Sequence, residues 1–295
     1  MEIIRSLELV GRLIRQCWAS RADGCSEKIS REHVVSKSIL KRIGHFNLQV
    51  EHEGVVTFQK EIGINSATVK FLCKNHNSAL SPYDKEGLKF IKTIDGFSQS
   101  DNIIEGEFTD RFGIRRLVVD GYNLERWAAK TFLNSAAFIQ AVDTNEPAWT
   151  GGSSNSVFDA IFDCKPIEKP FGLYQVRGIN FRAKADFKSR DLCFKVIPSS
   201  VNFYDTKKGH WIGKRRVPGL FYFSIYGIDF LFNMNLRSFR MEKEPDMIGP
   251  FLKLLDENNL NYYYRPKAIG ISRNNEPMIK TDIEDVPPRV IEINW

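Results

Sequence analysis

The chain has 295 residues, of which 42% are hydrophobic and 26% are charged, and its 42 Lys and Arg outnumber its 36 Asp and Glu. This composition excludes an intrinsically disordered chain, which would have fewer aromatics and more charge. The length exceeds the commonest single-domain size of roughly 100 to 150 residues, so we expect two domains. The net charge of +6 would suit a polyanionic partner, but it does not identify one by itself.

The N-terminal segment has neither the pattern of a secretory signal nor that of a membrane span. Charged residues interrupt its apolar positions, and the apolar runs of the chain are far shorter than the roughly 20 residues that cross a bilayer. Five cysteines are an odd number, which argues against a secreted disulfide framework. We therefore expect a cytoplasmic protein without a membrane partner, in which residues 2–16 form a short amphipathic helix.

Helical and strand-like patterns alternate in the first half of the chain. The stretch "EHEGVVTFQKE" alternates as a hairpin does, whereas "NLERWAAKTFLNSAAFIQAV" carries apolar residues on one helical face. In chain order the patterns predict a helix at 34–44 that Gly44 ends, a hairpin at 46–61, a strand at 68–72 that leads into Cys73, a helix at 81–97, a hairpin at 103–121 that turns near 111–113, and a helix at 123–142 with Asn123 as its N-cap.

A stretch rich in Gly, Ser, Asn and Pro, at residues 143–156, marks the expected domain boundary. Beyond it Val, Ile, Phe and Tyr alternate, which predicts an antiparallel sheet or sandwich with one helix at 250–259. We therefore predict an α+β fold, with helical and hairpin additions in a domain at 1–143 and a β-rich domain at 144–295.

No motif indicates what the β-rich domain does. Its segment "KKGHWIGKRR", Lys207–Arg216, is expected to be a loop between strands that could grip DNA by charge and stacking or guard an exposed strand edge. Cys164 and Cys193 lie in strand-like surroundings and are expected in the core. The domain could recognise DNA, bind a protein partner or sense a ligand, and the chain could form a homo-oligomer.

The other three cysteines and one histidine form a pattern typical of a zinc site. Cys73 and His76 are three residues apart, a spacing that points two ligands at a common centre, and Cys17 and Cys25 lie on a turn-rich loop upstream. The first pair is spaced more widely than usual, so the loop between its cysteines would have to bulge. The alternative is that the cysteines are small buried residues in a reducing compartment.

Glu32, His33 and Asn77 add a carboxylate, an imidazole and an amide oxygen to this pattern. A divalent cation held by a carboxylate and an amide oxygen can polarise a scissile phosphate and stabilise the leaving oxygen. A neutral imidazole can take a proton from the attacking water. The set therefore suits phosphodiester hydrolysis with one catalytic metal ion, because the histidine supplies the base.

The strings "REHVVSKSIL" and "LCKNHNSALS" resemble the signature strings of HNH endonucleases, the ββα-metal nucleases, and the resemblance covers residues 17 to about 85. It implies an N-terminal ββα-metal (HNH) nuclease unit in which a hairpin carries the acid–histidine pair, a helix carries the asparagine and a zinc knuckle staples the motif. It also implies a general base at His33, a catalytic Mg²⁺ or Mn²⁺ held by Glu32 and Asn77, and an insertion at about 45–67. The zinc ligands that it implies are Cys17, Cys25, Cys73 and His76. The implied activity is metal-dependent hydrolysis of DNA, or alternatively RNA, of the kind found in bacterial defence systems and mobile elements.

These residues also have other possible roles. Glu32 could be a solvated surface carboxylate, Asn77 could cap the helix that starts nearby, and His45 or His52 could replace Cys17 as a zinc ligand. Basic residues around the motif could contact nucleic-acid phosphates or form a solvated face. These basic residues are Lys28, Arg31, Lys37, Lys41, Arg42, Lys70 and Lys74. A lapsed nuclease site would leave a zinc-stapled module that binds nucleic acid or protein, which is the alternative function.

Overall fold

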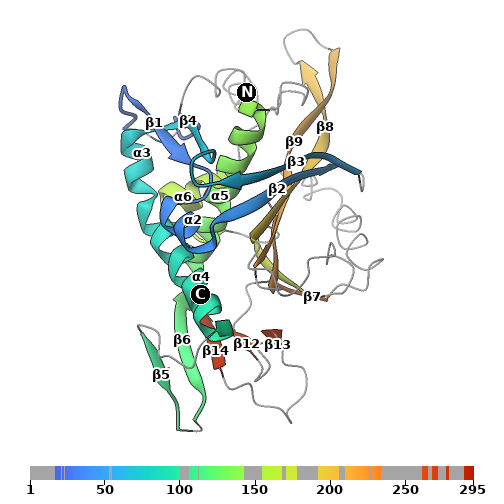
Figure 1. Ribbon diagram of the computed structural model, residues 1–295. Coiled ribbons are helices and arrows are strands. Elements are labelled where there is room, and N and C mark those ends of the chain that lie inside the picture. The colour runs from blue at the N-terminus through green and yellow to red at the C-terminus, as the bar shows by residue number, and fades with distance from the viewer. Residues whose placement is uncertain are drawn as a thin grey trace.

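Two long helices, α4 (Ser81–Gln99) and α5 (Gly121–Val142), lie against one face of a seven-stranded sheet in the computed structural model (Figure 1). The structure describes residues 17–20, 22, 24–52, 55–99, 106–111, 113–142, 155–167, 171–177, 192–205, 210–225, 228–233, 261–264, 268–271, 277–278 and 289–295. The helices predicted at 2–16 and 250–259 lie outside these residues.

The seven-stranded sheet has the order β11-β7-β10-β9-β8-β2-β3. Its strands are β2 (His45–His52), β3 (Val55–Gly63), β7 (Gly172–Arg177), β8 (Leu192–Asp205), β9 (His210–Ile225), β10 (Ile228–Asn233) and β11 (Asn261–Tyr264). Neighbouring strands run antiparallel except β2 and β8, which are parallel. The predicted antiparallel sheet is therefore present, and the hairpin predicted at 46–61 extends it.

Two smaller sheets are present in the part of the chain that the structure describes. One has the order β13-β12-β14-β6-β5, and the other pairs β1 with β4 in antiparallel orientation. Their strands are β1 (Ile29–His33), β4 (Thr68–Cys73), β5 (Glu107–Thr109), β6 (Arg115–Asp120), β12 (Ala268–Ile271), β13 (Pro277–Met278) and β14 (Arg289–Asn294). Three shorter helices are α2 (Lys37–Ile43), α3 (Lys74–Ala79) and α6 (Asn155–Phe162). The fold is mixed α+β with several sheets.

Aromatic side chains join the long helices to the seven-stranded sheet. Phe90 of α4 meets Phe230 of β10 at 5.6 Å between ring centroids, edge to face. Phe132 of α5 stacks on Phe221 of β9 at 5.1 Å. All four rings are fully buried, and burial of this apolar area is the main force that holds the helices on the sheet.

The strand pairing crosses the expected domain boundary. In the seven-stranded sheet β2 pairs with β8, with Phe46 opposite Leu192, and in the five-stranded sheet β6 pairs with β14. Most of the buried hydrophobic residues that the structure describes belong to a cluster with members on both sides of residue 143. The residues before and after residue 143 thus share two sheets and a core. The division into domains 1–143 and 144–295 stays a prediction.

Several predicted elements are confirmed with shifted ends. The helix predicted at 34–44 begins at Lys37, and Gly44 ends it with a φ of 86°, a left-handed conformation that glycine adopts without steric cost. The strand that leads into Cys73, the helix predicted at 81–97 and the hairpin predicted at 103–121 are β4, α4 and the β5–β6 pair. Among the described residues, no helix combines the length and the apolar character that crossing a bilayer requires.

Four local predictions are wrong. Asn123 is not the N-cap of α5; its N–H donates to Oδ1 of Asp120 at 2.9 Å, so Asp120 caps the helix. Cys164 is exposed instead of buried, with a φ of 56° after the end of α6, while Cys193 is half-buried in β8. The predicted loop Lys207–Arg216 is a strand from His210 onward. Helix α6 begins inside the stretch at 143–156, where no helix was predicted.

Candidate metal centre

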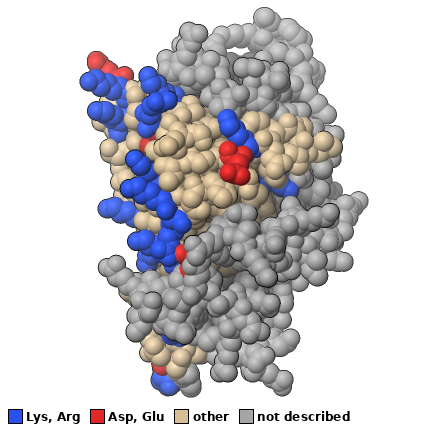
Figure 2. All heavy atoms as spheres, in the orientation of Figure 1, with Lys and Arg blue, Asp and Glu red and all other residues tan. Residues whose placement is uncertain are grey.

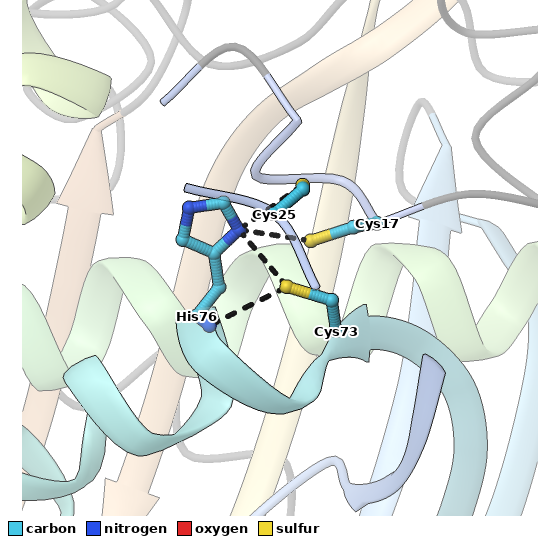
Figure 3. A group of neighbouring side chains, drawn as sticks. All are labelled: Cys17, Cys25, Cys73 and His76. Atoms are coloured by element: carbon cyan, nitrogen blue, oxygen red, sulfur yellow. Dashed lines mark hydrogen bonds between the residues drawn. The ribbon is translucent and has the colours of Figure 1, made fainter. Parts of the chain in front are cut away.

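The four predicted zinc ligands converge where an N-terminal loop meets β4 and α3 (Figure 3). Their ligand atoms all lie within 4.8 Å of one another. Nδ1 of His76 lies 3.3 Å from Sγ of Cys17, 3.3 Å from Sγ of Cys73 and 3.5 Å from Sγ of Cys25. A tetrahedral zinc ion, with bonds of about 2.3 Å to sulfur and about 2.0 Å to nitrogen, separates these atoms by about 3.5 Å. The four residues, which we call the Cys3His cluster, therefore fit a structural Zn²⁺ ion.

The turn from β4 into α3 prepares Cys73 to act as a thiolate. Its sulfur accepts the backbone N–H groups of His76 at 3.5 Å and of Ser26 at 3.4 Å. Burial raises the pKa of Cys73, but these N–H donors, together with side-chain hydrogen bonds from Ser26 and Cys17, outweigh burial and lower the pKa to about 6. Burial instead raises the pKa of the Cys17 thiol to about 12. A thiol with so high a pKa ionises at neutral pH only when a cation displaces its proton, so the donor set is suited to a metal ion.

The loop at 17–28 is fixed to β4 and α3 by hydrogen bonds. The N–H of Trp18 donates to the carbonyl of Phe71 at 3.0 Å, and the side-chain amide of Asn75 donates to the carbonyl of Gly24 at 3.0 Å. Trp18, next to Cys17, is thus held at β4, and Gly24, next to Cys25, is held at α3. These two contacts explain how a wide cysteine spacing still brings both sulfurs to one centre.

Helices α5 and α6 cover the Cys3His cluster. The His76 ring packs edge-on against Phe162 of α6, with 5.3 Å between ring centroids. The indole N–H of Trp18 donates to Oδ1 of Asn134 of α5 at 3.1 Å, and the Asn134 amide donates to the carbonyl of His33 at 3.4 Å. Asn134 is completely buried, so it links the cysteine-bearing loop to the end of β1.

A second group of polar side chains surrounds Glu32, and we call it the Glu32 cluster. The Asn77 side chain hydrogen-bonds the Glu32 carboxylate. The ammonium of Lys130, a side chain only 2% exposed, lies 3.7 Å from Oε1 of Glu32 and 2.5 Å from Oδ2 of Asp84. Burial raises the pKa of both carboxyls, and Lys130 counteracts part of this rise.

The charge of the Glu32 cluster is not balanced. Its two carboxylates and one ammonium leave one negative charge in a largely buried place, where an uncompensated charge is costly. The oxygen donors of Glu32, Asn77 and Asp84 are of the kind that Mg²⁺ and Mn²⁺ prefer. The residues therefore fit a divalent cation by donor type and by charge, although Lys130 already supplies one positive charge there.

His33 has different neighbours from Glu32. Successive side chains of a strand point to opposite faces, and in β1 the buried Glu32 lies between the exposed Arg31 and the half-buried His33. Burial lowers the pKa of His33, and a hydrogen bond from its ring to the carbonyl of Ile64 opposes this effect. Glu32 and Asn77 meet, whereas His33 lies on the other face of β1.

Lys130 is the residue of the Glu32 cluster that sequence reasoning missed. The sequence contains one relevant signal: Lys130 follows the buried Trp127 by three residues, so it lies on the inward face of α5. A lysine on such a face needs a buried anionic partner.

Comparison of the chain with protein-family models, with curated proteins and with solved structures gives no match. The features that indicate a function are therefore the Cys3His cluster, the Glu32 cluster and the position of His33.

Proposed function

We propose that the chain is a metal-dependent endonuclease of the HNH type that hydrolyses phosphodiester bonds in DNA. In this proposal His33 is the general base, Glu32 and Asn77 hold a catalytic Mg²⁺ or Mn²⁺, and the Cys3His cluster holds a structural Zn²⁺. The observation that carries the proposal is that Glu32 of β1 and Asp84 of α4 meet around Lys130, next to Asn77 of α3 and the Cys3His cluster.

The arrangement of secondary structure also supports the proposal. Strands β1 and β4 are antiparallel, and α3 follows β4 directly. The α2 helix and the β2–β3 hairpin occupy the stretch between β1 and β4, where an insertion was expected at about 45–67. Two antiparallel strands and a helix thus bring the acid and the amide together, while the Cys3His cluster fixes the start of the helix.

The proposed reaction is an in-line displacement at phosphorus, in which His33 and the Glu32–Asn77 pair would act on one phosphate from opposite faces of β1. One ring nitrogen of His33 donates to the Ile64 carbonyl, so in the neutral imidazole the other nitrogen can accept a proton. A water would lose a proton to His33 as its oxygen forms a bond to phosphorus, and the opposite P–O bond would break. A divalent cation bound at Glu32 and Asn77 would stabilise the leaving oxygen. Lys130 counteracts part of the rise that burial causes in the pKa of Asp84 and Glu32.

One observation favours the second candidate, a zinc-stapled module that binds nucleic acid or protein without cleaving it. The Lys130 ammonium already lies 3.7 Å from Glu32 and 2.5 Å from Asp84. Such an ammonium can replace a metal ion as the partner of these carboxylates. This candidate predicts binding without hydrolysis.

Plasmid cleavage separates the two candidates. The purified wild-type chain is expected to nick or linearise supercoiled plasmid in Mg²⁺ or Mn²⁺, and His33→Ala is expected to lose at least about 100-fold in rate because the general base is gone. His45→Ala, which removes a histidine of β2, serves as the matched control and is expected to cleave at the wild-type rate. Both variants should keep the wild-type zinc content and melting temperature.

Two outcomes would end the nuclease proposal. One is a wild-type chain that binds zinc, is folded and leaves plasmid intact in both metals. The other is a folded His33→Ala variant with the activity of the wild type.

A further inference from the structure

Helix α4 carries a row of exposed lysines on the face that is turned away from the core. Lys85, Lys89 and Lys92 are spaced by four and three residues, so they lie along one side of the helix, and all three are exposed. Lys89 lies 3.5 Å from Glu86, and no salt bridge involves Lys85 or Lys92 among the residues that the structure describes. Like charges four residues apart destabilise a helix slightly, so this row has no evident structural benefit.

A cationic pair lies on the β1–β4 sheet, separate from the lysine row. Arg31 and Lys70 are directly opposite each other in the register of the two strands, and both are exposed. Like charges in directly opposite positions destabilise a sheet. Because strand side chains alternate, Arg31 is on the same face of β1 as His33. The fold therefore holds two like charges together next to the proposed general base.

These two features belong to one side of the molecule. Lys and Arg side chains gather along the edge where β1, α3, α2 and α4 lie, with few acidic side chains among them (Figure 2). Helix α3 contacts both β1 and α4. The lysine row begins at Lys85, the residue after Asp84 of the Glu32 cluster. The lysine row of α4 therefore starts beside the Glu32 cluster.

We propose that Arg31, Lys70, Lys85, Lys89 and Lys92 form one surface, the basic surface, that binds the phosphate backbone of duplex DNA. DNA as the ligand rests on the proposed function. The distance from Lys85 to Lys92 is about 10.5 Å at 1.5 Å per helical residue, which corresponds to about three steps of 3.4 Å along one DNA strand. The row is thus long enough for its three lysines to reach three of the four phosphates in such a stretch, and the Arg31–Lys70 repulsion is relieved when a phosphate lies between the two cations.

The salt dependence of DNA binding tests the lysine row. The full chain binds a fluorescent duplex of about 30 base pairs, without added Mg²⁺, and the affinity is measured by anisotropy between about 50 and 300 mM salt. The triple variant Lys85→Gln/Lys89→Gln/Lys92→Gln is expected to flatten the slope of log affinity against log salt by about 2.7, or about 0.9 for each lost phosphate contact. The matched control Lys60→Gln/Arg111→Gln/Lys165→Gln removes three exposed charges from other elements and is expected to leave the slope unchanged.

Lys70→Glu tests the cross-strand pair by two readouts, the melting temperature and the affinity for the duplex. Basic residues that only contact solvent would not change the affinity. Because the substitution replaces repulsion by attraction to Arg31, we expect the melting temperature to rise by about 1–3 °C. The affinity for the duplex should fall at least about tenfold, because a phosphate now meets a carboxylate. A stabilised variant with weaker DNA binding supports the basic surface.

Three results would overturn the basic surface: a triple variant with the wild-type slope, a control variant with an equal loss of slope, or a wild-type chain that binds phosphatidylserine vesicles and not the duplex. These failures are distinct from failure of the proposed function. A chain that cleaves plasmid but binds DNA independently of the α4 lysines refutes the basic surface alone. A chain that binds DNA through these lysines but never cleaves it refutes the nuclease alone.

Discussion

The Cys3His cluster and the Glu32 cluster both gather ionisable side chains, but they differ in whether the protein supplies a cation of its own. Three sulfurs and one imidazole nitrogen meet at the first, and none of its four residues carries a fixed positive charge. At the second, the protein supplies its own cation, because the Lys130 ammonium lies between two carboxylates. We therefore expect only the first cluster to depend on a metal ion for its stability, and we expect the second to be stable without a divalent cation.

The largest effect is expected from loss of a thiolate. Cys73→Ser should remove the bound zinc and lower the free energy of unfolding by more than about 5 kcal/mol, because metal-binding energy contributes directly to folding. Metal analysis and calorimetry measure both quantities. Cys164→Ser, at an exposed cysteine outside the cluster, is the control and should keep one zinc per chain. A Cys73→Ser chain that retains one zinc ion would contradict the dependence of the Cys3His cluster on a metal ion bound by Cys73.

Removal of the internal cation should come next. Lys130→Met leaves Glu32 and Asp84 buried without their partner, and we expect a loss of about 3–5 kcal/mol in urea unfolding. The zinc content should not change. The double variant Lys130→Met/Asp84→Asn removes one of the two unpaired charges, so its loss should be smaller. If Lys130→Met cost less than about 1 kcal/mol, Lys130 would not be the counter-ion of this cluster.

A packing change at the crossing of α4 and α5 should have an intermediate effect on the Glu32 cluster alone. A Cβ at Gly87 would come within 2.5 Å of the Trp127 ring, and this ring is 1% exposed and enclosed by the core. Gly87→Ala should therefore push the helices apart and cost about 1–3 kcal/mol. The change lies three residues from Asp84, so it should weaken divalent-cation binding while zinc stays bound. Gly63→Ala, where a Cβ meets open space, is the control.

The smallest effect is expected at the residue that connects the cysteine-bearing loop to β1. Asn134→Ala leaves the indole N–H of Trp18 and the carbonyl of His33 without this partner, and we expect a loss of about 1–2 kcal/mol. Hydrogen exchange should report faster opening at the end of β1. Unchanged exchange there would mean that Asn134 does not couple the loop to His33.

The difference between the clusters also explains what could be predicted from the sequence. The spacing of Cys73 and His76 is local, so their convergence follows from one short turn. The lysine row and the buried face of α4 likewise follow from a helical period. The Glu32 cluster is not local: Lys130 lies 98 residues after Glu32 in the sequence, and no spacing rule connects them.

The sequence also does not show which distant strands pair with each other. Alternating apolar residues predicted the strands around Phe46 and Leu192, but alternation does not say which strands pair, and β2 joins β8 across almost 150 residues. Helix α6 was missed because its first residues continue a stretch rich in Gly and Ser. Contacts from other elements help to hold it: Arg126 donates to the carbonyl of Ala160 at 2.8 Å, and the Tyr83 hydroxyl donates to that of Ile161 at 2.6 Å.

X-ray absorption at the zinc edge on the purified full-length chain is the most direct measurement of the Cys3His cluster. We expect one zinc ion per chain, with three sulfur neighbours at about 2.3 Å and one nitrogen neighbour at about 2.0 Å. A chain that folds without zinc, or a zinc ion surrounded only by nitrogen and oxygen, would show that the four side chains do not form a metal centre.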